Sequence, residues 1–203
     1  MDLIEDIKLY LPQYLSEDNL NALKQQLKAF GEGRDSGEYF TTRLKDEPFL
    51  FQGDGVRSIM FNLPSLDLKE DVPVLLLSNT CDMDLNNKRF NTCKIMYAPI
   101  LNLDKYIAKL KNNRISNDRI QSHVNEIKNQ TISQILYLPT TLLCGHDSIV
   151  MFDRAISIPL SEDNIHRMCS NRLFTLSNYG FYLLLLKLSY HFTRIQEKVD
   201  RSV

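Results

Sequence analysis

The feature that most constrains the fold is a short apolar run, residues 72–78, which ends abruptly in the polar sequence Asn79-Thr80-Cys81-Asp82. An uninterrupted apolar run of this length indicates a β-strand that is buried on both faces. Side chains alternate along a strand, so we expect residues 74 and 76 on one face and residues 75 and 77 on the other. The polar end of such a strand leaves the core at a rigid edge, where binding sites are commonly built.

The remaining patterns predict an α+β protein. We expect a small, bent, mostly antiparallel sheet or partly open barrel, with N-terminal helices and a long C-terminal helix, because the βαβ alternation of a doubly wound fold is missing. The 203 residues suffice for one core and one domain. Within that domain the apolar patterns distinguish a helical lead (1–37), a sheet body (38–160) with a helical insertion (102–130), and a C-terminal helical region (161–203).

Individual elements follow from periodicity and from helix and strand breakers. Apolar alternation or short apolar runs predict strands at 59–63, 72–78, 94–98, 135–138 and 149–158, with Pro99 ending the third. Helical spacing and capping residues predict helices at 104–110 and 118–127, and a final helix from Ser177 to about Val199.

Charge and cysteine usage narrow the functional classes. The formal net charge is −1, so no extended nucleic-acid track is expected, although a local basic patch stays open. The N-terminal stretch is acidic and amphipathic rather than a signal peptide, and the most apolar segment is too short to span a bilayer. We therefore expect a cytoplasmic protein with reduced thiols, no membrane contact and a protein partner, and the sequence leaves the oligomeric state open.

Thr80, Cys81 and Asp82 are the first candidate site residues. A thiol beside a carboxylate at a strand end could be a nucleophile or a ligand, but a nucleophilic cysteine needs a base, and the four histidines are distant in sequence. The alternative is structural: Thr80 or Asp82 caps a turn, and Cys81 is a small buried apolar side chain. No catalytic residue is assigned from the sequence.

Asp54 and Arg194 are further candidate site residues, whereas a calcium loop and a phosphate-binding loop are not expected. Gly53-Asp54-Gly55 indicates a turn in which Asp54 is a candidate site residue, and Arg194 could pair with a carboxylate at the sheet edge. The spacing Asp82-x-Asp84-x-Asn86 resembles the start of a calcium loop but lacks its glycine and its closing glutamate, so no metal site is expected. A Gly-x-Gly-x-x-Gly phosphate loop is missing as well, and no cofactor is expected.

Several motifs together resemble a group of uncharacterised bacterial proteins. These are the Gly53-Asp54 pair, the strand end Ser78-x-Thr80-Cys81-Asp82, and the strand Tyr97-Ala98-Pro99, and they span much of the chain. Some members of the group resemble the small barrels of the MazF/PemK toxin class. The resemblance associates the chain with bacterial conflict or phage-defence gene clusters, and it implies no established activity.

These observations favour a cytosolic bacterial accessory or binding module, with its site at the end of the central strand. The alternatives are a MazF-like endoribonuclease and a cysteine-dependent hydrolase. Three arrangements in the fold would separate them. A histidine beside Cys81 would favour the hydrolase, a basic groove beside Thr80 would favour the nuclease, and the lack of both would favour the binding module.

Overall fold

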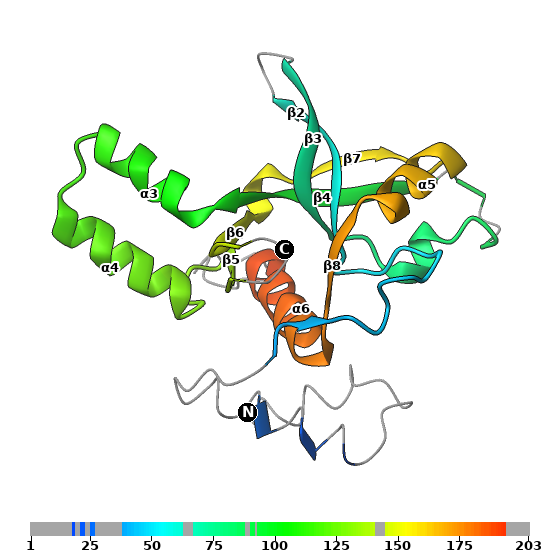
Figure 1. Ribbon diagram of the computed structural model, residues 1–203, viewed down its shortest axis with the longest axis horizontal. Helices are drawn as coiled ribbons and strands as arrows, with labels where there is room; N and C mark the ends of the chain where they lie inside the picture. The colour runs from blue at the N-terminus through cyan, green and yellow to red at the C-terminus, as the bar shows by residue number, and fades with distance from the viewer. Residues whose placement is uncertain are drawn as a thin grey trace, which may run out of the picture.

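The structure is a computed structural model, which describes residues 38–62, 67–87, 90–91, 93–140 and 145–193, together with positions 18, 21–22 and 25–26. The expected helical lead (1–37) lies almost entirely outside the described residues. The α+β class and the bent antiparallel sheet are confirmed, because the described strands form one curled, half-barrel sheet (Figure 1).

The sheet has the strand order β1-β8-β2-β3-β4-β6-β5, and β7 pairs with β4 beside this path. Its strands are β1 (Phe40–Thr41), β2 (Gly55–Asn62), β3 (Asp67–Leu76), β4 (Lys94–Asn102), β5 (Ile135–Leu138), β6 (Ser148–Met151), β7 (Ile156–Pro159) and β8 (Arg172–Leu176). The helices are α3 (Leu103–Asn112), α4 (Asn117–Lys128), α5 (Glu162–Ser170) and α6 (Asn178–Thr193), with short 3₁₀ turns η1 (Thr80–Met83) and η2 (Phe152–Arg154).

The central strand is confirmed as β3. Val74, Leu75 and Leu76 are fully buried, and Leu77 is buried just beyond the strand end. The expected two faces are also confirmed: Val74 and Leu76 belong to one core cluster, while Leu75 and Leu77 belong to another. The strand is therefore covered on both sides, as its uninterrupted apolar sequence requires.

Pro99 does not end its strand, contrary to expectation. β4 continues to Asn102, and Pro99 pairs with Val74 of β3. On its other edge β4 pairs with β7 up to Tyr97 and with β6 from Ile100. Pro99 falls between these two ladders, where a missing N–H removes no ladder bond, so proline is tolerated in mid-strand.

The expected strand at 149–158 is two strands. β6 and β7 are separated by the turn η2, and each pairs with a different part of β4. β6 is buried throughout and β7 buries Ile158, so the apolar pattern continues from one strand into the next and hides the break. Sequence patterns also left out β8, the strand that joins β1 to β2.

α6 and α5 cover opposite faces of the central strand, and α3 and α4 extend one end of the sheet. α6 packs its apolar residues Tyr182, Leu183 and Leu184 into the core cluster that contains Leu75. The predicted helices at 104–110 and 118–127 are confirmed as α3 and α4, which form a hairpin that projects from the sheet body (Figure 1). The described part of α6 ends at Thr193, and its expected continuation lies outside the described residues. A search of the described helices finds none with the length and apolar character needed to cross a membrane.

Candidate binding site at the end of the central strand

The polar end of β3 is held by side chains that bond the backbone. The Asn79 side chain accepts a hydrogen bond from the Cys81 N–H at 2.9 Å and caps η1. Asn79, rather than Thr80, is therefore the N-cap of η1, because it precedes the turn and its short side chain reaches forward to the second residue of the turn. Thr80 bonds elsewhere: its hydroxyl oxygen accepts a hydrogen bond from the Gln52 N–H at 3.0 Å.

A tight turn at 51–54 packs against this strand end. The Asp54 N–H donates to the Phe51 carbonyl at 3.0 Å, and the Asp54 carboxylate accepts from the Phe51 N–H at 3.0 Å. Gly53 adopts φ +87°, which favours glycine at this position. The Gly53 N–H then donates to the Leu76 carbonyl at 2.9 Å, so the turn is joined directly to β3.

Asp54 forms a buried ion pair with Arg172, the first residue of β8. The distance from Arg172 Nε to Asp54 Oδ2 is 3.1 Å, and the two side chains are 4% and 0% exposed. Asp54 Oδ1 and Thr175 Oγ1 are also buried, and neither makes a hydrogen bond of good geometry. The sequence-predicted candidate Asp54 thus lies inside the protein, where its carboxylate is matched mainly by one guanidinium.

Burial sets the protonation chemistry of Asp54. Desolvation raises the pKa of its carboxyl above the ordinary value, and the hydrogen bond from Phe51, the Arg172 charge and the nearby Thr175 hydroxyl partly offset it. A buried acid of this kind is a common mark of a functional site, and it is equally a common mark of a structural ion pair. The contacts of Arg172 decide between the two.

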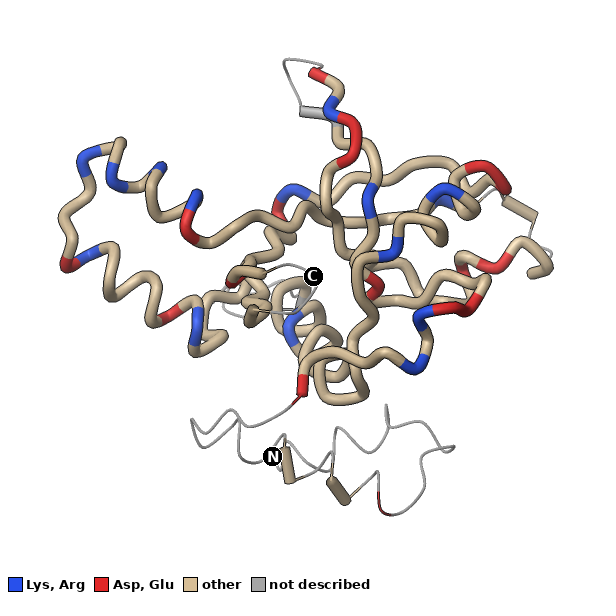
Figure 2. Tube along the Cα trace, viewed as in Figure 1, with Lys and Arg blue, Asp and Glu red and all other residues tan. Residues whose placement is uncertain are grey.

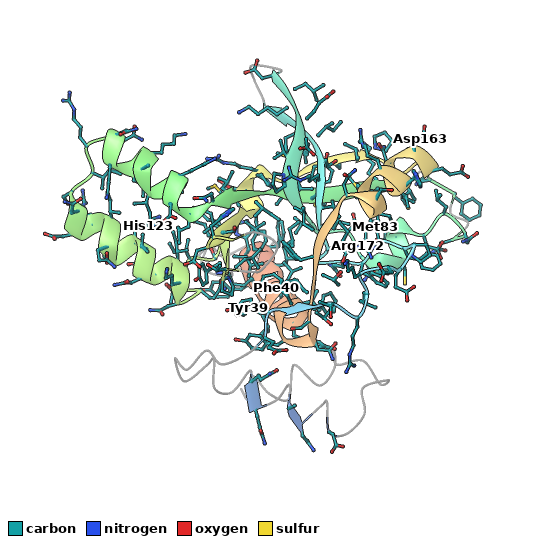
Figure 3. The ribbon with its side chains drawn as sticks, in the orientation of Figure 1. Tyr39, Phe40, Met83, His123, Asp163 and Arg172 are labelled. Carbon is teal, nitrogen blue, oxygen red and sulfur yellow. The ribbon has the colours of Figure 1, made fainter. Side chains whose placement is uncertain are left out.

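Arg172 binds a whole segment of backbone. Its guanidinium donates to the carbonyls of Leu44, Glu47 and Phe49, and its carbon lies 5.7 Å from the centre of the Phe51 ring. Figure 3 shows Arg172 on β8, beside the part of the molecule that carries Met83. The ion pair therefore acts as a clamp that fixes residues 44–54 against the sheet, and it lies behind the site rather than at its surface.

The fixed segment forms one wall of a hollow beside the end of β3. The hollow has a volume of about 440 Å³. Its described lining is mostly apolar and comes from three parts of the chain: Pro48, Phe49, Leu50, Phe51, Thr80, Cys81, Met83, Asp84, Leu85, Asn86 and Ile165 of α5. Two of its large apolar side chains, Phe49 and Leu85, are 55% and 45% exposed, so the hollow has an open apolar rim.

Cys81 lines this hollow and is exposed, which contradicts the expectation of a small buried side chain. It leaves the core because η1 turns the chain immediately after the buried strand. Within the described part of the chain its hydrogen bonds use backbone atoms, with Asn79 and Asn87, and no histidine bonds its thiol. The described cysteines, Cys81, Cys93 and Cys169, are all free thiols.

Of the remaining candidates from the sequence, Asp82 and Asp84 are described in the structure and Arg194 is not. Asp82 lies within η1, next to the lining residues but outside the set that forms the hollow. The Asp84 carboxylate accepts the Asn86 N–H at 2.9 Å and forms a local turn in place of a calcium loop. No metal-ligand cluster occurs among the described residues. Arg194 lies outside the described residues.

The structure adds site residues that the sequence patterns did not indicate. No local pattern indicates the buried role of Arg172, because that role depends on the unpredicted strand β8. Phe49, Leu85 and Ile165 look like ordinary core residues in the sequence, because nothing local shows that they stay exposed around a hollow. Comparison with known proteins gives no further guide: no protein-family model matches the chain, and no curated protein matches it significantly.

Proposed function

We propose that the protein is a binding module whose hollow at the end of β3 receives an apolar side chain of a protein partner. The hollow is open, apolar and walled by a rigid segment. Preformed concave sites of this composition suit the anchor residue of a partner, because burying apolar surface drives the association and a rigid wall limits the entropy lost.

The lining is the single observation that carries this proposal. Among its described residues there is one ionisable carboxylate, Asp84, and no lysine, arginine or histidine. A ribonuclease site beside Thr80 would need cations for the phosphate backbone. A cysteine hydrolase would need a base near Cys81. The lining therefore supports binding over both alternatives.

The same lining suggests the chemistry of the partner. An apolar anchor fits between Phe49, Phe51 and Leu85, and Asp84 favours a lysine or arginine next to that anchor in the partner sequence. The wider assignment, a cytosolic bacterial accessory protein of a conflict or phage-defence system, depends on the sequence resemblance and is part of the proposal.

Selection of random peptides displayed on phage tests the proposal. We expect the parent protein to enrich peptides that share an apolar anchor beside a basic residue. A Cys81→Trp variant should lose binding of those peptides by more than about tenfold, because the indole fills the hollow. Ser122→Trp, on the exposed face of α4, is the matched control. Failure to enrich any such motif, or equal binding by Cys81→Trp, would contradict the proposal.

A further inference from the structure

We infer that the α3–α4 hairpin is a contact arm for the phosphate backbone of double-stranded nucleic acid. The hairpin projects from one end of the molecule (Figure 1), and none of its described residues lines the hollow beside η1. It therefore forms a second surface, which is independent of the proposed peptide site.

The arm carries an excess of positive charge. Residues 103–128 contain six lysines and arginines against three acidic residues, although the whole chain carries a formal charge of −1. Figure 2 shows the cations along α3 and around the far end of the hairpin. They are Lys105, Lys109, Lys111, Arg114 and Arg119, and all five are exposed.

These five cations are available to a partner. Among the described residues, none of the five forms an ion pair. The sixth cation, Lys128, lies at the base of the arm, where its Nζ is 2.8 Å from Asp147 Oδ2. Stabilisation of the helices explains only part of their placement. Lys109 and Lys111 suit the negative end of α3, but Arg119 lies in the first turn of α4, where the helix dipole opposes a positive charge.

The arm is rigid enough to present these charges in a fixed arrangement. The Tyr106 hydroxyl and His123 Nε2 are 2.9 Å apart and join α3 to α4. Leu103 and Ile127, which are buried, pack the base of the hairpin onto β5 and β6. A rigid backbone fixes where these cations are attached, so binding costs little backbone entropy and only the side chains have to be ordered.

The uncharged residues of the arm favour duplex nucleic acid among anionic partners. Asn112, Asn113, Ser116 and Gln121 are exposed amides and hydroxyls of the kind that bond phosphate oxygens. A stacking platform for single strands would need exposed aromatic rings, but the arm's aromatic residues, Tyr106 and His123, are half-buried against each other. A membrane surface would need exposed apolar anchors, and Ile115 alone among the large apolar residues of the arm qualifies.

Fluorescence anisotropy with a short DNA duplex of mixed sequence tests this inference. We expect the full chain to bind the duplex at low salt, with a slope of roughly −4 in log K against log salt for four or five phosphate contacts. Changing Lys109, Lys111, Arg114 and Arg119 together to glutamine should weaken binding by more than about tenfold and move the slope towards zero.

The control variant changes four exposed cations of the sheet body to glutamine, namely Arg43, Lys45, Lys94 and Arg154, and circular dichroism confirms that both variants are folded. It should retain most of the duplex affinity. Equal losses in the two variants, or no loss in the arm variant, would overturn the inference. Tighter binding to polyglutamate or to phosphatidylserine vesicles than to the duplex would also overturn it, in favour of an acidic protein or a membrane surface. These outcomes leave the peptide site untouched, because the arm variant keeps the hollow intact.

Discussion

Arg172 is the residue on which the candidate site depends most. Its guanidinium has little contact with solvent, neutralises Asp54 and binds the carbonyls of the segment that forms the wall of the hollow. Removing one partner of a buried pair leaves the other charge without compensation, and here it also leaves several carbonyls without a donor.

We predict that Arg172→Met lowers the free energy of unfolding by about 3–5 kcal/mol. The double variant Asp54→Asn/Arg172→Met should recover part of this loss, because the buried carboxylate is no longer left alone. Urea denaturation measures both. Arg167→Met is the control, since the Arg167 side chain is exposed and bonds only its helix neighbour Asn164 among the described residues. A loss below about 1 kcal/mol for Arg172→Met would show that the clamp is dispensable.

The carboxyl group of Asp147 should make the free energy of unfolding depend on pH. Burial would raise the pKa of its carboxyl, but hydrogen bonds from Lys128, Thr140 and Tyr137 and the Lys128 charge outweigh burial and lower the pKa from 3.8 to about 2. The lowered pKa stabilises the fold above pH 4, and this contribution disappears as the pH falls towards 2.

The Asp147→Asn variant should therefore be less stable than the parent by about 2 kcal/mol near neutral pH, and the difference should vanish near pH 2. Denaturant titrations at several pH values give the comparison. The exposed Asp153→Asn provides a control whose difference from the parent should stay small throughout. A constant difference between Asp147→Asn and the parent across this range would contradict the assignment.

The sequence placed the candidate site residues near the end of the central strand, but it did not predict what their side chains contact. Asp54, Thr80 and Cys81 do come together at the end of β3. However, Asp54 proves to be a buried support, Thr80 holds the neighbouring turn, and Cys81 is exposed in the lining. Their roles depend on Arg172, more than one hundred positions along the chain from Asp54, and no local pattern reports such a long-range contact.

At the scale of elements, α6 depends on a close approach to the chain before β1. A Cβ atom at Gly180 would lie 2.3 Å from the Tyr39 carbonyl oxygen, which itself accepts the Ser177 N–H at 2.9 Å. Glycine here allows the first turn of the helix to pack directly on backbone.

We predict that Gly180→Ala costs about 1–3 kcal/mol, because α6 must shift away from Tyr39. In an unconstrained helix the same change would stabilise by about 0.5–1 kcal/mol. Thermal and urea unfolding report the sign. Ser122→Ala on exposed α4 is the matched control, which should be neutral or slightly stabilising. A more stable Gly180→Ala protein would show that the approach is not tight.

Elements with strong periodicity were predictable, and those defined by their partners were not. The central strand β3 and the helices α3 and α4 follow from apolar spacing alone. The continuation of β4 through Pro99 and the division of 149–158 into β6 and β7 depend on which strands lie alongside. Partner choice is a property of the sheet, so single-strand patterns cannot report it.

Across the whole molecule, the formal net charge conceals an excess of positive charge on one part of the chain. The formal charge of −1 predicted no extended nucleic-acid track, and the described sheet body supports none beside Thr80. The α3–α4 arm instead combines six lysines and arginines with three acidic residues, and its cations lie along α3 and around the far end of the hairpin (Figure 2). The molecule thus carries an apolar hollow near one end and a basic arm at the other, which would allow a protein partner and a phosphate backbone to bind at the same time.

The proposed role of the hollow at the end of β3 is to bind an apolar anchor residue of a partner. The most direct test is a titration of ¹⁵N-labelled protein with a phage-selected peptide, followed by amide chemical shifts. We expect the largest shifts at residues 48–51 and 80–86 and at Ile165, with residues 103–128 unchanged. Shifts confined to other surfaces, or a response at the hollow that persists in Cys81→Trp, would contradict it.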